Sequence, residues 1–389
     1  MKIVYCIDAI CHLGGIERIT IAKANALADM EGNQVWIVAA EHRKPFFPLL
    51  LSEKVNFVNL GVNYTAEDWK GKWYVLKGFL GKRALHKKRL KQSLDEIQPD
   101  IVISTGYSEK YFLSFLKVKS KPVFIREIHY TSDYRRRTAY GWYWRLMAWA
   151  SDFLDYRILI KKYDCITVLT QEDKNRYWNN DKKVVVMPNP LTVKHNQRST
   201  LTNKVVVTAG RLTYPKNYPS LIRAWGHVER IHPDWRLMIW GDGGDKNMLE
   251  EQIDSLGLND KVHLMGYTDD IMSKFADASI FVLSSRYEGF ALVLLEAMSC
   301  GLPAVSYACP CGPSDIVTDG KDGFLVALGN EGMLAKCICH LIEDEELRRR
   351  MGKAALERSK AFAMDKIIAR QMNLFTTLIH NKRRSRERK

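Results

Sequence analysis

Residues 279–307 limit the possible folds of this chain more than any other part of the sequence. Residues 279–285 form a short run of β-branched and aromatic residues, which predicts a buried strand. Gly301 and Pro303 indicate the end of a helix that begins near Phe290, and a second apolar run follows them. The order is therefore strand, loop, helix, strand, which is the unit of a parallel sheet with helices packed on it.

Two carboxylates stand eight positions apart in this stretch, Glu288 in the loop and Glu296 within the helix. The helix is apolar on nearly every side and is expected to be buried, where a carboxylate is costly unless a donor hydrogen-bonds to it. For Glu296 that donor is either a pair of ligand hydroxyls, such as those of a ribose, or a buried Arg or Lys. Beside Glu288, the helix N-terminus offers unpaired N–H groups to a phosphate.

Glu288-Gly289-Phe290, Glu296-Ala297-Met298 and Cys300-Gly301-Leu302-Pro303 together resemble the E-x7-E motif of the retaining glycosyltransferases of family 4, which have the GT-B fold. The resemblance implies that Glu296 binds the ribose of a nucleotide-sugar and that Glu288 contacts the donor sugar. It also implies donor contacts along the loop and the first helical turn, at Gly289, Phe290, Ala291 and Leu292.

A second motif precedes this one in the chain. The predicted strand at residues 205–208 is followed by Gly210, Arg211 and Lys216. An arginine offers forked hydrogen bonds and a lysine a point charge, so this strand end suits a diphosphate. The same G-R-L-x-x-x-K pattern occurs in the resembled family before the donor phosphates. The two motifs lie about 75 residues apart in the family's order, and the loop at Met265, Gly266 and Tyr267 is implied to lie near the base.

The N-terminal part offers Gly14 and Gly15 between a strand at residues 2–8 and a helix predicted at residues 19–30. Their spacing is not G-x-G-x-x-G, which disfavours a dinucleotide fingerprint. In the resembled family such a pair faces the donor phosphates or the acceptor, although a G-G pair is often only a turn. His129 directly follows a predicted strand. By resemblance it reaches the donor sugar and acts in catalysis with Glu288, Arg211 and Lys216, although a lone histidine is often structural.

Strands alternate with helical segments in both halves, which indicates doubly wound parallel sheets. With 389 residues, two domains are expected. We predict an α/β protein of GT-B type with two Rossmann-like domains that face a central cleft: an acceptor-side domain at 1–188 and a nucleotide-sugar domain at 189–363. A helix at 364–381 is expected to cross back to the first domain, and 382–389 to be a disordered basic tail. The polar piece at 194–204 predicts a linker.

The net charge of +15 is concentrated in two segments. Residues 69–91 contain nine Lys and Arg without an acid, and residues 382–389 contain six against one Glu. Aromatic residues accompany the first segment and also residues 130–163, as in surfaces that contact anionic lipid. Nucleic acid binding uses the same ingredients, and a merely solvated basic face is a third alternative.

No apolar run approaches the roughly 18 residues of a membrane span, and the N-terminus lacks a signal-peptide pattern. We therefore expect a cytoplasmic protein that associates peripherally with the inner face of the cytoplasmic membrane. The eight cysteines form no C-x-x-C or paired Cys/His spacing, and the chain has no D-x-D motif. We expect no metal and no cofactor.

The expected activity is that of a retaining hexosyltransferase. It would move a hexose from a nucleotide-sugar, with UDP-sugar favoured over GDP-mannose, to a glycan or lipid-linked acceptor in bacterial lipopolysaccharide, capsule or exopolysaccharide synthesis. The alternatives are a GT-B sugar-nucleotide epimerase and a basic nucleic-acid-binding protein. The second would leave Glu288, Glu296, Arg211 and Lys216 unexplained, so no nucleic acid partner is expected.

Overall fold

The computed structural model describes residues 1–10, 14–41, 51–64, 72–139, 141–156, 162–193 and 195–387, with residues 72–79 described as backbone alone. The chain divides into two compact units. Unit 1 consists of Met1–Val168, Lys174–Thr192 and Met364–Lys389, and unit 2 of Leu169–Asp173 and Val193–Ala363. The sequence predicted the main boundary at 188/189, and the structure places it at Thr192/Val193.

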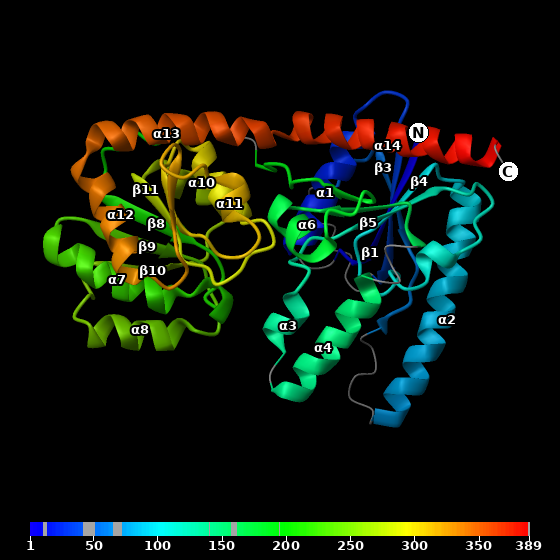
Figure 1. Cartoon of the computed structure of the whole chain (residues 1–389), viewed down its shortest axis with the longest axis horizontal. Helices are drawn as coiled ribbons and strands as arrows, with labels where there is room; N and C mark the ends of the chain where they lie inside the picture. The colour runs from blue at the N-terminus through cyan, green and yellow to red at the C-terminus, as the bar shows by residue number, and fades with distance from the viewer. Residues whose placement is uncertain are drawn as a thin grey trace. The chain divides into compact units, whose positions relative to one another are not determined.

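Unit 1 contains a seven-stranded sheet, parallel throughout, in the order β3-β2-β1-β4-β5-β6-β7 (Figure 1). Its strands are β1 (Lys2–Ala9), β2 (Gln34–Glu41), β3 (Val55–Asn59), β4 (Ile101–Ser104), β5 (Val123–Glu127), β6 (Cys165–Val168) and β7 (Val184–Val186). Its helices are α1 (Gly15–Ala28), α2 (Lys72–Ile97), α3 (Tyr134–Thr138), α4 (Trp142–Leu154) and α14 (Met364–Glu387), and α6 (Gln171–Trp178) spans the boundary between the units.

The strands of unit 1 are apolar on both faces because helices cover both faces of the sheet. In β1, Ile3 and Tyr5 belong to one buried cluster, while Val4 and Cys6 belong to the other. This alternation is the two-residue period of a strand. The sheet therefore separates two hydrophobic cores, as in a doubly wound fold.

Unit 2 contains a six-stranded sheet, again parallel, in the order β10-β9-β8-β11-β12-β13. Its strands are β8 (Val205–Ala209), β9 (Arg236–Trp240), β10 (Val262–Gly266), β11 (Ile280–Leu283), β12 (Ala304–Tyr307) and β13 (Gly323–Val326). Its helices are α7 (Tyr218–Ile231), α8 (Lys246–Ser255), α9 (Ile271–Ala276), α10 (Leu292–Ser299), α11 (Pro313–Ile316), α12 (Glu331–Glu343) and α13 (Glu345–Ser359). The predicted strand, loop, helix and strand at 279–307 are β11, its loop, α10 and β12.

The C-terminal helix α14 belongs to unit 1, where Ile368 and Phe375 lie in the core beside β1. The helix continues to Glu387, so the expected disordered tail is wrong for residues 382–387. Lys382 Nζ donates to Asp164 Oδ2 at 2.6 Å and to the Pro122 carbonyl at 2.6 Å, which fixes this end of the helix. Residues 388–389 lie outside the described residues.

Residues 195–204 form no helix or strand, but they are attached to unit 2. Ser199 N donates to the Cys300 carbonyl at 2.9 Å, and Leu201 is buried. The predicted linker is therefore part of the second unit over these residues. Lys194 lies outside the described residues.

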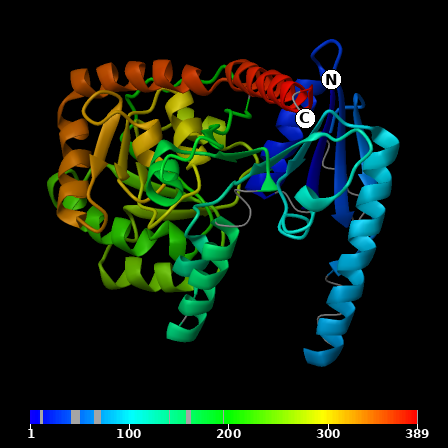
Figure 2. The same ribbon diagram turned by 45° about the vertical axis from the view of Figure 1, so that its right-hand side comes forward.

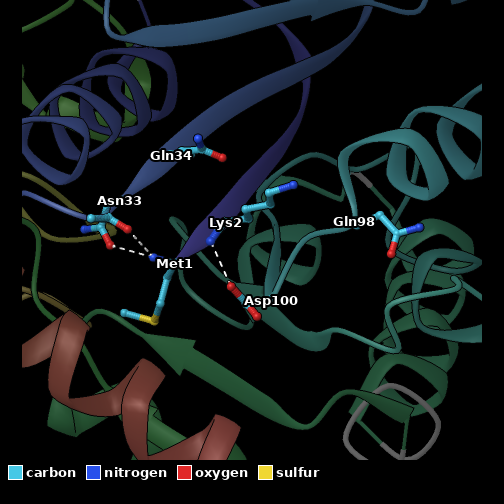
Figure 3. A pocket seen from close by; sticks show the side chains of 7 residues that line it. Met1, Lys2, Asn33, Gln34, Gln98 and Asp100 are labelled. Atoms are coloured by element: carbon cyan, nitrogen blue, oxygen red, sulfur yellow. Dashed lines mark hydrogen bonds between the residues drawn. The ribbon is translucent and has the colours of Figure 1, made fainter.

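A pocket lies at the edge of the first sheet where the strands begin, and the first residues of β1 line it (Figure 3). Its polar groups bind one another: Lys2 N donates to Asp100 Oδ2 at 2.9 Å, and the N-terminal ammonium donates to the Gly32 carbonyl at 2.5 Å. Ligands of doubly wound sheets bind beyond the opposite, carboxyl ends of the strands. A ligand site of this fold is therefore expected at the edge of the sheet opposite to this pocket.

Candidate active site

The order of strands in unit 2 reverses between β8 and β11. At such a switch point the two following loops leave the sheet in opposite directions and open a crevice. The loop after β8 contains Gly210, Arg211 and Lys216, and the loop after β11 contains Glu288. Two motifs that lie far apart in the sequence thus meet at one place in the fold.

Lys216 and Glu288 form an ion pair across these loops. Lys216 Nζ lies 2.7 Å from Glu288 Oε1, and the two side chains are 21% and 12% exposed. Ser285 Oγ donates to the same carboxylate oxygen at 2.6 Å. The ammonium and the carboxylate are thus held in place between the loops that follow β8 and β11.

Further hydrogen bonds join the two loops. Ser284 Oγ donates to the Lys216 carbonyl at 2.8 Å, and Arg286 N donates to the Pro215 carbonyl at 2.8 Å. The Arg286 guanidinium lies 4.5 Å from the centre of the Tyr214 ring. These contacts fix the backbone on both sides of the ion pair, so its geometry does not depend on one side-chain contact.

Gly210 lies close to two neighbouring side chains. A Cβ at this position would lie 3.0 Å from Lys216 Cε and 3.0 Å from Tyr218 Oη. At the neighbouring Gly241 a Cβ would lie 2.0 Å from the Gly210 carbonyl oxygen, which is closer than any side chain can approach. Glycines at both strand ends therefore allow the backbones of the β8 and β9 loops to lie side by side under the site.

Helix α10 starts beside Glu288. Ala291 precedes it in the left-handed conformation, with φ of 54°, and no side chain caps the first turn. The first amides of a helix have no partner within the helix, so this N-terminus can donate to an anion. Glu296 lies one turn further on, 4% exposed, and it interacts with other groups of the protein.

The remaining predicted donor residues of unit 2 have different exposures. Arg211 follows Gly210 and is exposed, whereas Phe290 and Ala291 are buried. The Met265 and Tyr267 side chains are exposed, and Tyr267 Oη donates to Asp269 at 2.7 Å. Between them, the Gly266 carbonyl accepts from Gly241 N at 2.8 Å, which connects the β10 loop to the glycines under the site.

Three predicted site residues lie in unit 1. Gly14 precedes the first turn of α1, where a Cβ would lie 2.3 Å from the Glu17 carboxylate, and Gly15 is exposed with open space around it. His129 follows β5, and its side chain is 2% exposed, with Nε2 3.1 Å from Glu127 Oε1. Burial lowers the pKa of His129, more than the nearby Glu127 raises it.

Lys23 of α1 also pairs with Glu127. Burial alone would raise the pKa of Glu127, but the Lys23 ammonium and the hydrogen bond from His129 outweigh it and lower this pKa. Because the pKa of His129 is itself lowered, we assign the compensating positive charge to Lys23 and a neutral imidazole to His129 at pH 7. His129 thus lies in a buried polar cluster of unit 1.

A second polar cluster, which was not predicted from the sequence, lies at the carboxyl ends of β1, β4 and β5. Asp8 accepts from the amides of Tyr107 and Ser108 at 2.7 and 3.0 Å. Glu109 accepts from Ser104 Oγ at 2.7 Å, and Arg126 Nη1 donates to the same hydroxyl at 2.7 Å. Polar residues inside otherwise apolar strand sequences, such as Arg126 in β5, are the signal that could have indicated this cluster.

Two doubly wound parallel sheets in one chain, with this site at the switch point of the second, are the arrangement of GT-B glycosyltransferases. Residues 13–195 match a family model described as Glycosyltransferase Family 4, and residues 192–358 match one described as Glycosyl transferases group 1. The chain belongs to glycosyltransferase family 4 and is a glycosyltransferase. The predicted family and fold class are therefore confirmed.

Two of the curated relatives have names that refer to glycans. The chain is 30% identical to an exopolysaccharide phosphotransferase of Streptomyces coelicolor over 97% of its own length, but it spans only 41% of that relative. It is 26% identical to an alpha-1,4-N-acetyl-D-galactosaminyltransferase of Campylobacter jejuni, whose name specifies a glycan on PP-undecaprenol, over 94% of this chain and 96% of the relative.

Solved structures agree on the fold. The Anabaena protein Alr3699/HepE in complex with UDP superposes with a TM-score of 0.75 and 19% identity, over 97% of this chain and 100% of that one.

Proposed function

We propose that this chain is a retaining hexosyltransferase of bacterial lipopolysaccharide, capsule or exopolysaccharide synthesis, with UDP-sugar favoured over GDP-mannose as the donor. The observation that most supports this proposal is the Lys216–Glu288 pair at the switch point of unit 2. It brings a cation for a diphosphate and a carboxylate for a sugar to adjacent positions, beside the open N-terminus of α10.

In the proposed donor complex, the diphosphate lies against Arg211, Lys216 and the first turn of α10. The Glu296 carboxylate accepts from the ribose hydroxyls, and Glu288 accepts from a hydroxyl of the sugar. The β10 loop at Met265, Gly266 and Tyr267 lies beside the base. Gly14, Gly15 and His129 of unit 1 contribute to the phosphate, acceptor and sugar contacts, as family resemblance implies.

The proposed reaction is a displacement on one face of the sugar. The bond between the anomeric carbon and the diphosphate oxygen breaks, and the acceptor hydroxyl forms its new bond from the same side. The hydroxyl proton passes to the leaving diphosphate, so the products are the glycoside and a nucleoside diphosphate. The fixed cations and the α10 dipole stabilise the charge that develops on the leaving group, without a metal.

The proposed acceptor is a glycan or a lipid-linked glycan. The Campylobacter relative is named for a PP-undecaprenol acceptor, and the Streptomyces relative for an exopolysaccharide. A lipid-linked acceptor requires the enzyme to work at a membrane surface, and we propose peripheral association with the inner face of the cytoplasmic membrane. Among the described helices none is long and apolar enough to cross a bilayer.

The test begins with nucleotide binding. A thermal-shift panel with UDP, GDP and ADP and their sugars should show the largest stabilisation with the matching base, because a ligand at 100 times its dissociation constant adds about 2.7 kcal/mol. NMR of the glycoside formed from the identified donor should show the donor's anomeric configuration. Inversion of that configuration would refute retention, and interconversion of nucleotide-sugars without an acceptor would establish the epimerase alternative.

A further inference from the structure

Helix α4 of unit 1 has an unusual distribution of apolar residues. It is 13 residues long, and only Ala148 and Asp152 among them are buried. Eight of its large apolar side chains are between 49% and 79% exposed: Trp142, Tyr143, Trp144, Leu146, Met147, Trp149, Phe153 and Leu154. Single exposed apolar residues are normal on a protein surface, but a continuous set on one helix indicates an interaction site.

The polar side of α4 faces the protein. Asp152 Oδ2 accepts from Arg136 Nε at 2.8 Å, and Ser151 Oγ accepts from Arg135 Nη1 at 2.7 Å, so α3 binds to α4 through charged groups. Asp155, at the C-terminal end of α4, accepts from Lys110 Nζ at 2.9 Å. The helix thus contacts unit 1 through its polar residues. An ordinary surface helix instead packs its apolar face against the core.

Large apolar side chains cover most of the remaining helix surface, and Trp149 and Phe153 border the Arg136–Asp152 pair in a pocket that all four residues line. Trp142, Leu146, Trp149 and Phe153 follow one another at spacings of four, three and four residues, so they share one face of the helix. The Trp149 and Phe153 rings stack, with centroids 5.8 Å apart. The described charged residues of α4 are Arg145 and Asp152, and of these only Arg145 is exposed. Arg145 lies three residues after Trp142 and four before Trp149, so the outer face of α4 is apolar with this one cation at its edge.

The composition of this outer face fits a lipid bilayer. Trp and Tyr are enriched where a membrane meets water, because their rings are apolar and their N–H or O–H groups remain hydrated. Among the eight exposed apolar residues of α4 three are Trp and one is Tyr, and two of these Trp residues, Trp142 and Trp149, lie on the outer face. At about 1.5 Å per residue, α4 is about 20 Å long, too short to span a hydrocarbon layer of about 30 Å, so it can only lie in the interface.

The position of α4 in unit 1 supports the same partner. In both views the free end of the α3 and α4 hairpin and the N-terminal end of α2 project to the same side of the unit (Figures 1 and 2). The Asp152 and Asp155 end of α4 lies at a pocket that Lys110 and Arg126 also line, beside the carboxyl ends of β4 and β5. A bilayer on the outer face of α4 would thus adjoin the edge of the sheet where ligands of such folds bind.

We propose that the outer face of α4, defined by Trp142, Leu146, Trp149 and Phe153, inserts into the headgroup region of a phospholipid bilayer and anchors unit 1 there. This inference rests on the proposed membrane location and names the element responsible. The anchor acts by apolar burial, so it differs from attraction between the basic segment at 69–91 and anionic lipid. High salt weakens the second kind of binding much more than the first.

The test is co-sedimentation with vesicles of phosphatidylethanolamine, phosphatidylglycerol and cardiolipin at low and high salt. One variant combines W142Q, L146Q, W149Q and F153Q. A matched control combines I231Q, M248Q, L256Q and L328Q, which replace four exposed apolar residues of unit 2. We expect the α4 variant to lose about tenfold or more of its vesicle partitioning at high salt, while the control matches the wild type.

Calorimetric measurement of UDP affinity distinguishes failure of the membrane-anchor proposal from failure of the proposed glycosyl transfer. The α4 variant should bind UDP as the wild type does, which shows that unit 2 folds, and its circular dichroism and melting temperature should match the wild type, which shows that unit 1 folds as well. If it also binds vesicles as the wild type does, the anchor is refuted while the proposed glycosyl transfer stands. If the wild type binds vesicles but neither UDP nor any other nucleotide, the proposed function fails and the anchor stands. Light scattering that finds a dimer dissociated by the α4 substitutions would assign this face to a second copy and overturn the proposal.

Discussion

At the scale of single residues, the Lys216 ammonium is the group on which donor binding should depend most. Replacement with Ala removes a charge-assisted contact worth about 1.5 to 3 kcal/mol, so nucleoside diphosphate affinity should fall about 10- to 100-fold. Arg211→Ala should have a similar effect. Calorimetry with UDP measures both, and Lys246→Ala, which removes an exposed lysine of α8 paired with Glu250, is the control. Unchanged affinity in both variants would remove these cations from the site.

The two glutamates should differ in their kinetic effects. Glu288→Gln keeps the size of the side chain but removes the charge beside Lys216, so it should mainly lower kcat. Glu296→Gln weakens the proposed acceptor of the ribose hydroxyls, so it should mainly raise KM for the donor. Gln is preferred to Ala here because Glu296 is buried and truncation would leave a cavity. Wild-type values of kcat and KM in both variants would contradict the assignment.

Glu109 in the second polar cluster should make stability depend on pH. Burial, and then the Asp8 charge, raise the pKa of Glu109 from 4.5 to about 7, against the opposing effect of Arg126. The folded state thus holds a proton that the unfolded state loses, so the free energy of unfolding falls by about 3 kcal/mol as pH rises from about 4.5 to about 7.

Glu109→Gln should flatten that dependence, because the amide oxygen can accept the hydrogen bonds from Ser104 Oγ and Gly106 N and the amide does not ionise. Urea unfolding at several pH values between 4.5 and 7.5 measures the slope. Glu96→Gln, on the exposed side of α2, serves as the control and should leave the slope as in the wild type. An equal slope in Glu109→Gln would mean that other groups cause the pH dependence.

At the scale of elements, the loops after β8 and β11 and the start of α10 are proposed to replace a metal. Their cations and backbone amides are fixed by contacts such as that of Ser284 with the Lys216 carbonyl, so little reorganisation is needed when the diphosphate leaves. EDTA should therefore leave the transfer rate unchanged. A rate that is lost with EDTA and restored by magnesium or manganese would show that these elements are insufficient.

In helix α14, some of the positively charged side chains attach the helix to unit 1. Six cations in the last eight residues suggested a disordered tail, but Lys382 binds Asp164 and the Pro122 carbonyl, and Arg386 donates to the Lys121 carbonyl. The helix brings these cations to carboxylate and carbonyl oxygens near β5 and β6. Part of the basic character of this segment is therefore structural.

At the scale of the whole molecule, the excess positive charge is expected to attract anionic membranes. In the described part of the basic segment, Arg89 donates to the Leu60 carbonyl at 2.6 Å and Lys82 to the Asn63 carbonyl at 2.8 Å, whereas Lys87 and Lys88 are exposed. Trp69 and the side chain of Trp73 lie outside the described residues. Lys87 and Lys88 are thus suitable probes of long-range attraction, because their replacement should not disturb the fold.

The variant with Lys87→Gln and Lys88→Gln should bind anionic vesicles more weakly, by about 1 kcal/mol for each charge at low salt, and should match the wild type at high salt. Co-sedimentation with vesicles of graded phosphatidylglycerol content measures this effect. Arg89→Gln, in contrast, should lower the melting temperature. If the double variant binds as the wild type at every salt concentration, the basic segment is only a solvated surface.

From the amino-acid sequence alone we could predict the two doubly wound sheets, the family and the candidate residues of unit 2. These follow from local patterns: apolar strand runs, glycines at strand ends, and a glutamate in a buried helix sequence. The helix after Gly14 begins at Gly15 rather than near residue 19, because Glu17 and Arg18 in its first turn interrupt the apolar pattern without ending the helix. The sequence also gave no distance between Lys216 and Glu288.

Which side chains meet, and which face of a helix is exposed, depends on the three-dimensional fold. The Lys216–Glu288 pair depends on β8 and β11 being neighbours, although they are more than 70 residues apart in the chain. The raised pKa of Glu109 depends on burial beside Asp8, which comes from another strand. The exposed apolar face of α4 follows from the binding of its polar residues to Arg135, Arg136 and Lys110. Periodicity alone cannot indicate this, because a helical pattern separates two faces but does not state which of them faces the core.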